Sequence, residues 1–361
     1  MIELDGSYLE GGGALVRVAL ALSALTGQEF KVNNIRSGRA ESGLKAQHLQ
    51  AITALKKIGN AETNHLEIGS TELHFIPGKI QKGTYEIDIG TAGSIVLLLQ
   101  ALILPCLFAP GKITLKVKGG TCGKGQAPVE ALQNILLPQL QRFVQKMELK
   151  VLKQGYYPKG GGEVQLEISP KNTAVSLPLL YQELASTPIF NLTRPGTLEQ
   201  IRGIINCSTD LTEKKIAERI QHSAKMALKR YTVPVTIRMN YNQTLSTGGD
   251  IVLWAVFSHG QEVSSINPII LGSDAYLEKN KSSEQIGQEA AERLKKEIDS
   301  DAAVDRHVAD QLIPFMALLP GSAIRASEIT DHTRTNIYIA EQFLPVKFNI
   351  LGNKISVQKR A

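Results

Sequence analysis

A short polar segment near the C-terminus holds the residue best suited to chemistry. His332 lies within Thr330-Asp331-His332-Thr333-Arg334-Thr335-Asn336, and apolar residues then follow with a helical period. Thr335 or Asn336 is the expected N-cap, which places His332 just before a helix N-terminus. The partial positive charge of that end disfavours an imidazolium, so a neutral, nucleophilic ring is expected. A capping loop whose histidine only forms a hydrogen bond is the competing interpretation.

The N-terminal region offers a candidate phosphate site. Residues 6–13 form a glycine-rich loop that carries Glu10, and an apolar helix is predicted at 14–25 with Arg17 as its only charge. A helix N-terminus, a guanidinium group and a carboxylate can together hold a phosphate and a divalent ion. A structural Arg17–Glu10 ion pair is the alternative.

A second basic loop lies further along the chain. Arg36 and Arg39 precede a helix predicted at 44–58, and Gln47 lies near the start of that helix. Two arginines in front of a helix N-terminus are typical of an anion-binding site. A solvated basic turn fits the same pattern.

One structural unit recurs three times along the chain. Each copy has an apolar helix, a stopping glycine (27, 111 or 321), a strand, a polar loop and an amphipathic helix. At similar distances before these glycines lie Arg17, Gln100 and Gln311, with Asp310 beside the last. At similar distances after them lie Arg39, Lys124 and His332. Equivalent placement predicts that these polar groups converge on one cleft, which favours a chemical role for His332.

The pattern changes between residues 181 and 300. Strands at 198–207 and between 233 and 270, with helices at 212–231 and 282–298, indicate an inserted, smaller α+β domain. The predicted fold is therefore α+β with α/β-like repeats. Residues 1–180 hold repeats 1 and 2, residues 181–300 the insert, and residues 301–361 repeat 3 with the candidate nucleophile. The basic faces of the long insert helices fit either solvation or RNA contact.

Composition narrows the class of protein. The 361 residues carry a net charge of +6, and the pI is about 9.0, which favours polyanionic partners. The three cysteines form no CxxC pair, which indicates a reducing, cytoplasmic compartment without a zinc site. The longest apolar run, 95–110, is interrupted by Gln100 and Pro105, so it predicts a core helix rather than a membrane span.

The motifs described above, together with several shorter sequence blocks, resemble those of the RNA 3′-terminal phosphate cyclases over nearly the whole chain. The matching blocks are Asp5-Gly6-Ser7, Glu10-Gly11-Gly12-Gly13 with Arg17, Arg36 and Arg39 with Gln47-His48, Ala92-Gly93-Ser94 with Gln100, Gly120-Thr121 with Ala127-Pro128, residues 155–162, Ala309-Asp310-Gln311-Leu312, and His332 with Thr335-Asn336-Ile337. The resemblance implies a core of three βαβαββ-type repeats with an inserted domain.

The resemblance also implies a reaction. Such enzymes use ATP to convert an RNA 3′-terminal phosphate into a 2′,3′-cyclic phosphate. His332 would attack the α-phosphorus of ATP and form a covalent histidyl-AMP. AMP would then pass to the RNA 3′-phosphate, and the neighbouring 2′-hydroxyl would displace it. RNA is therefore the implied partner.

The roles of the other residues follow from the same resemblance. Glu10 corresponds to the metal-associated acid, for Mg²⁺ or Mn²⁺. The phosphate-binding and essential polar residues would be Arg17, Arg36, Arg39 and Gln47. The nucleotide site would contain Pro128 and His307, which sandwich adenine, together with Gln100, Asp310 and Gln311. The sequence departs from the family at Ala14, at Glu41-Ser42 and at His307, where some members have tyrosine. His307 is also a competing candidate for the nucleophile.

Two other functions share this architecture. Cyclase-like proteins bind RNA during ribosomal RNA processing without the histidine chemistry, and enolpyruvyl transferases have similar repeats. The presence of His332, Glu10 and Arg17 favours the enzyme over the binding factor. A nucleophilic histidine would have no use in an enolpyruvyl transferase.

Overall fold

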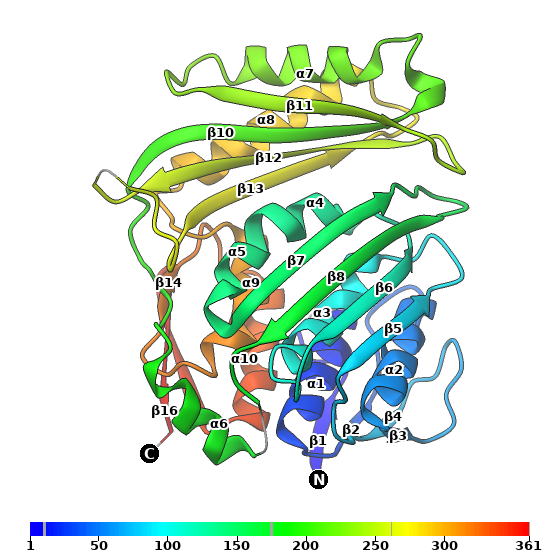
Figure 1. The fold of residues 1–361 in the computed structure, drawn as a ribbon, viewed down its shortest axis with the longest axis vertical. Helices are drawn as coiled ribbons and strands as arrows, with labels where there is room; N and C mark the ends of the chain where they lie inside the picture. The colour runs from blue at the N-terminus through cyan, green and yellow to red at the C-terminus, as the bar shows by residue number, and fades with distance from the viewer. Residues whose placement is uncertain (10–11, 174–175, 261, 361) are drawn as a thin grey trace.

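The structure is a computed structural model, and it describes residues 1–9, 12–173, 176–260 and 262–360. This part of the chain forms four sheets of four strands each, in the orders β1-β2-β4-β3, β5-β6-β8-β7, β15-β16-β14-β9 and β11-β10-β12-β13. Figure 1 shows the first three sheets in the lower body of the molecule and the fourth above them, with the helices α7 and α8. The predicted α+β class is confirmed.

The first repeat has the predicted βαβαββ order. β1 and β2 pair in parallel, so they need a crossover, which α1 supplies. The helix α1 ends at Gly27, whose φ of 71° is left-handed and whose N–H donates to the carbonyl of Ser23. The elements are β1 (Ile2–Asp5), α1 (Gly13–Thr26), β2 (Phe30–Asn33), α2 (Ala46–Gly59), β3 (Glu62–Thr63) and β4 (Leu73–Ile76).

The second repeat follows the same order but breaks its second helix. Its elements are β5 (Gly83–Asp88), α3 (Ile95–Cys106), β6 (Ile113–Gly119), α4 (Val129–Ala131), a π-helical turn (Leu132–Leu136), α5 (Leu137–Leu140), a 3₁₀ turn (Gln141–Phe143), β7 (Val144–Lys153) and β8 (Gly162–Pro170). The sequence pattern predicted one continuous amphipathic helix at this point of the repeat, and that prediction was wrong. Pro138 has no N–H to continue the regular ladder, and Leu137 bonds five residues back to Leu132.

The third repeat is split by the insert. A short helix, α6 (Leu177–Glu183), and a 3₁₀ turn (Leu184–Ser186) lead to β9 (Asn191–Leu192), and the repeat resumes with α9 (Arg306–Met316), β14 (Ala323–Arg325), α10 (Asp331–Phe343), β15 (Val346–Leu351) and β16 (Lys354–Lys359). β9 lies within the range expected for the insert, but it pairs in parallel with β14. The third sheet therefore takes its first strand from before the insert.

The insert is a sheet covered on one side by two helices. It contains β10 (Thr197–Ser208), a 3₁₀ turn (Thr209–Leu211), α7 (Ile216–Ala227), β11 (Val235–Asn242), β12 (Gly249–Ser258), β13 (Ile269–Tyr276) and α8 (Ser283–Asp299). β10 and β11 pair in parallel through α7, whereas β12 and β13 join antiparallel. The helices α7 and α8 pack against each other, and β13 contacts α4 and the π-helical turn of the core.

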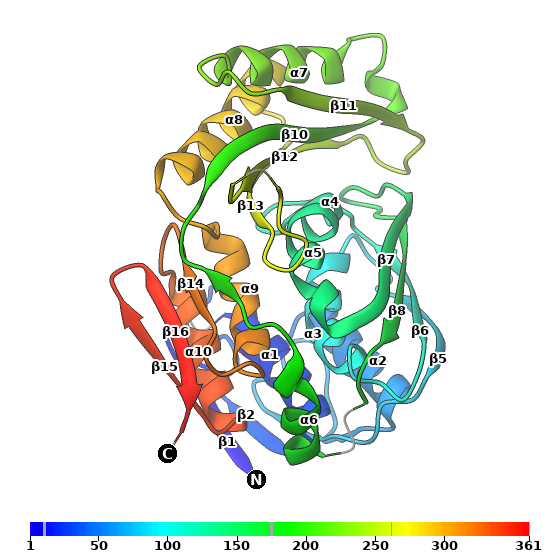
Figure 2. The same ribbon diagram turned by 60° about the vertical axis from the view of Figure 1, so that its left-hand side comes forward.

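Helices from all three repeats meet in the middle of the core. α1 contacts α2, α3 and α10, and α9 contacts α3 and α10. Figure 2 shows these helices between the second and third sheets. α3 buries ten of its twelve residues, as expected for a core helix. Within the described ranges, none of the helices combines the length and apolar character needed to cross a membrane.

The close crossing of α7 and α8 depends on Gly287. A Cβ at this position would lie 2.3 Å from the backbone oxygen of Ile220. We expect Gly287→Ala to destabilise the protein by about 1–3 kcal/mol through overpacking, although alanine has the higher helix propensity. Gln288→Ala, on the exposed face of the same helix, is the control and should be nearly neutral in chemical denaturation. Equal stability of the Gly287→Ala variant and the wild type would show that the helices can separate at no cost.

Candidate active site

A cavity of about 760 Å³ lies where the three repeats and the insert meet. The side chains that the sequence analysis singled out and that line this cavity are Arg17, Arg36, Arg39, Gln47, Gln100, Lys124, His307, Asp310, Gln311, His332 and Asn336. Pro128 is buried and does not line it, although the preceding Ala127 does. Glu10 lies outside the described residues. The structure thus brings together polar groups that are far apart in the sequence.

His332 lies in the first turn of α10 rather than before it. Thr330 is the N-cap, and its hydroxyl accepts a hydrogen bond of 3.1 Å from the N–H of Thr333. The expected caps, Thr335 and Asn336, are instead buried within the helix, and Thr330 accepts from one of the N–H groups at its start. The half-buried imidazole therefore projects from the positive end of a helix, where an anion is favoured.

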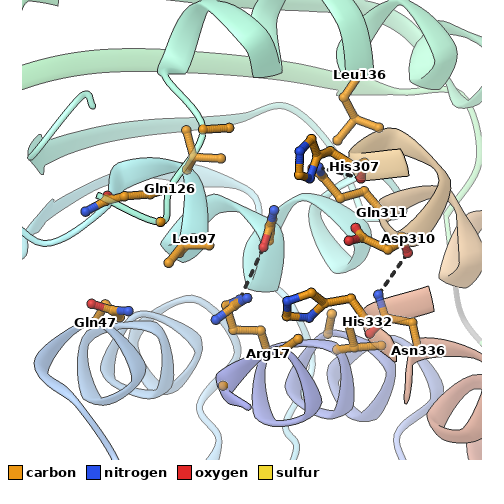
Figure 3. A pocket seen from close by; sticks show the side chains of 18 of the residues that line it. Arg17, Gln47, Leu97, Gln126, Leu136, His307, Asp310, Gln311, His332 and Asn336 are labelled. Atoms are coloured by element: carbon orange, nitrogen blue, oxygen red, sulfur yellow. Dashed lines mark hydrogen bonds between the residues drawn. The ribbon is translucent and has the colours of Figure 1, made fainter. Parts of the chain in front are cut away.

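α10 is fixed against α9 close to this histidine. The side-chain amide of Asn336 donates a hydrogen bond of 2.8 Å to the backbone carbonyl of Asp310. Figure 3 shows His332, Asp310 and Asn336 on these two neighbouring helices, with Arg17 beside His332. The predicted role of Asn336 as a cap is replaced by this interhelical contact.

Arg17 and Gln100 join the first two repeats inside the cavity. The Arg17 Nε donates to the Gln100 Oε1 at 3.2 Å, and the two side chains come from α1 and α3 (Figure 3). Both are half-buried. The amide oxygen of Gln100 thus orients the guanidinium group of Arg17 within the cavity.

Arg36 and Arg39 differ in their surroundings. The Arg36 Nη1 donates to the carbonyls of Glu41 (2.7 Å) and Gly43 (3.1 Å), so its side chain organises its own loop. Burial and the nearby charge of Arg39 lower the pKa of Arg36. Arg39 is exposed at the edge of the cavity. A ligand at the edge is therefore more accessible to Arg39, whereas Arg36 contributes mainly to the shape of the loop.

His307 lies in the first turn of α9, and Asp305 is the N-cap. The carboxylate of Asp305 accepts from the N–H groups of His307 (3.0 Å) and Val308 (2.9 Å), and from the N–H of Gly272 on β13 (3.0 Å). One buried carboxylate thus joins the insert to the helix that carries His307. Burial raises the pKa of Asp305 to about 7. Burial lowers the pKa of His307, so this imidazole is neutral at neutral pH.

A divalent ion requires several oxygen ligands. Within the described ranges, no three His, Cys, Asp or Glu side chains lie close enough together to hold a metal. The predicted ligand Glu10 is outside those ranges, and Asp310 lines the cavity. The described residues do not form a metal site by themselves.

The chain was compared with known proteins. The family model described as RNA 3′-terminal phosphate cyclase matches residues 8–350. The RNA 3′-terminal phosphate cyclase of Archaeoglobus fulgidus is 40% identical over 99% of this chain and 100% of its own length. Those of Pyrococcus furiosus and Methanopyrus kandleri are 39% and 38% identical, each over 98% of this chain and 96% of the relative. The chain belongs to the RNA 3′-terminal phosphate cyclase family.

In this member of the family, the cavity has a wall that sequence reasoning missed. Asp274 and Tyr276 on β13, with Arg293 on α8, line it from the insert. These residues occur in ordinary strand and helix patterns, and no motif marked them. Lys45 and His48 were also missed as cavity residues, although His48 is adjacent to Gln47 in a quoted block.

The surroundings of His48 decide whether its imidazole carries a charge. Its Nδ1 accepts a hydrogen bond of 3.0 Å from the N–H of Lys45, and its Nε2 has no hydrogen-bond partner among the described residues. Burial, together with the positive charges of Arg17, Arg36 and Lys45, lowers the pKa of His48 to about 3. His48 is therefore a neutral part of the cavity wall and not an additional cation.

This shift makes stability depend on pH. In the unfolded chain the imidazole of His48 has its ordinary pKa of 6.5, whereas in the folded protein its pKa is about 3. Its stabilisation is complete above pH 6.5 and declines as the pH falls below that value, by about 2–3 kcal/mol at pH 4.5. We expect His48→Asn, whose amide oxygen can accept from Lys45 without titrating, to lose correspondingly less stability between pH 7 and 4.5 in urea denaturation. Identical pH dependence of the two proteins would contradict this assignment.

Proposed function

We propose that this protein converts the 3′-terminal phosphate of RNA into a 2′,3′-cyclic phosphate at the expense of ATP. The observation that carries the proposal is the placement of His332, which lies in the first turn of α10 and lines one cavity with Arg17 and Arg39. Membership in the RNA 3′-terminal phosphate cyclase family supports the same reaction.

The first step is attack by a neutral ring nitrogen of His332 on the α-phosphorus of ATP. A nitrogen–phosphorus bond forms, the bond between the α-phosphorus and the bridging oxygen breaks, and pyrophosphate leaves. Arg17 and Arg39 stabilise the negative charge that develops on the phosphate oxygens. The free N–H groups at the start of α10 favour the same charge.

Two further transfers complete the reaction. An oxygen of the RNA 3′-phosphate attacks the phosphorus of histidyl-AMP, which releases His332 and gives an RNA–adenylate joined through a diphosphate. The 2′-hydroxyl of the terminal ribose then attacks the RNA 3′-phosphorus and loses its proton, and AMP leaves. The 2′-hydroxyl restricts the substrate to RNA.

A divalent ion, Mg²⁺ or Mn²⁺ with Glu10 as a ligand, is part of the proposal. Such an ion would neutralise charge on the triphosphate. Because the described residues do not form the site by themselves, the steps above are assigned only to groups of this chain.

The nucleophile can be tested by labelling the protein with ATP radioactive at the α-phosphate. We expect wild-type protein with a divalent ion to carry label through denaturing electrophoresis, and the label to be lost in acid, as for a phosphoramidate. His332→Ala should reduce labelling by roughly 10³-fold or more, because the attacking atom is removed.

His307→Ala is the matched control, since both histidines lie in the first turn of a helix and line the same cavity. It should keep the label, with a KM for ATP raised by up to about tenfold through loss of ring stacking. Loss of label only in His307→Ala would reassign the nucleophile. A wild-type protein that binds RNA but never becomes labelled would favour a non-catalytic RNA-binding factor.

A further inference from the structure

The cavity has a polar end and an apolar end. Arg17 and His332 lie together at the polar end, as Figure 3 shows. At the other end, Val96, Ala127 and Leu136 line both the main cavity and a smaller pocket of about 40 Å³. Figure 3 shows Leu136 next to His307, on the side of the cavity away from Arg17. Apolar walls beside a neutral imidazole suit the flat faces of a nucleobase.

Asp274 is the carboxylate at this apolar end. It lines both the main cavity and the smaller pocket, as do His307 and Gln311. Burial raises the pKa of Asp274, and the electrostatic interactions with His307 and Arg293 oppose that shift. Among the described residues, no group donates a hydrogen bond to its side chain. An ionised carboxylate can only accept hydrogen bonds, so this wall is complementary to a ligand that donates one.

The backbone around Asp274 is held firmly. The neighbouring Gly272 donates its N–H to Asp305, which also accepts from the N–H of His307. The Arg293 Nη1 donates to the backbone carbonyl of Asp274 at 2.7 Å, and its Nη2 donates to Glu289. Asp274 and His307 are therefore fixed relative to each other through Asp305, as a base-recognition site requires.

We propose that Asp274 accepts a hydrogen bond from the 6-amino group of the adenine base, so that the insert domain selects ATP over purine nucleotides with an oxygen at that position. The inference rests on the proposed function, because it requires the nucleotide to bind with its phosphates toward Arg17 and His332. His307 and the apolar residues hold the faces of the base, and Asp274 reads its edge. The insert is then part of the nucleotide site.

Three purine nucleotides that differ at position 6, of which inosine triphosphate also carries a hydrogen on N1, test this assignment. ATP has an amino group there, inosine triphosphate an oxygen, and purine riboside triphosphate a hydrogen. With each labelled at the α-phosphate, we expect the wild-type protein to react with ATP about 10- to 100-fold more efficiently than with either analogue, because a charge-assisted hydrogen bond is lost. This comparison requires no variant, so it holds even if a substitution prevents folding.

Asp274→Asn provides the second arm. Its amide can accept from an amino group and also donate to an oxygen, so the ratio of ATP to inosine triphosphate reactivity should fall to near one. Glu292→Gln is the matched control. Glu292 pairs with Lys295 at the surface of α8 and does not line the cavity. The substitution removes one negative charge from α8, so the variant should keep the wild-type ratio.

Each other outcome has a definite meaning. An unchanged ratio in Asp274→Asn, or an equal loss with all three nucleotides, would overturn base recognition and leave Asp274 as a residue that only orients His307. A wild-type preference for inosine triphosphate would overturn the choice of adenine. If no nucleotide labels the wild-type protein, the proposed function fails and this inference fails with it, whereas labelling without discrimination leaves the proposed function intact.

Discussion

A polar side chain on an apolar helix loses its hydration when the helix is buried. This loss costs free energy unless another group replaces the hydrogen bonds to water. Arg17, Gln100 and Gln311 are such side chains, one on the first long helix of each repeat. The structure resolves this constraint by directing all three into one cavity, where Arg17 and Gln100 are hydrogen-bonded. The site therefore exists only where the three repeats pack together, and no single repeat could form it.

The insert is attached to this assembly through a second constraint. Asp305 is buried, and it receives N–H groups from both β13 and α9. A buried carboxylate without such donors would be strongly unfavourable. The same interaction that caps α9 therefore sets the position of the insert, so a change in the insert can alter the wall of the cavity without touching the core repeats.

The sequence predicted the regular parts of this architecture well. Helical periodicity, stopping glycines and strand patterns predicted three copies of one unit that contains an apolar helix, a strand and an amphipathic helix, because local conformation and burial agree there. The full βαβαββ order was implied by the family resemblance. The prediction missed features that depend on a choice between two equally suitable residues, or on contacts between segments far apart in sequence. Thr330 and Thr335 are both good caps, and only the folded chain shows which is used. The pairing of β9 with β14, and the cavity wall formed by Asp274, depend on contacts between segments far apart in sequence.

The two histidines of the cavity have similar helical positions and different surroundings. His307 lies beside Leu136 and the apolar wall, and the carboxylate that caps its helix is already occupied by three N–H groups. His332 lies beside Arg17, and a neutral hydroxyl caps its helix. A phosphorus centre that gains negative charge is stabilised near a guanidinium group and a helix N-terminus. An aromatic base instead favours the apolar wall. The surroundings thus distinguish the two histidines and favour the proposed phosphoryl transfer at His332 and the proposed base binding at His307, although residue type and helical position do not distinguish them.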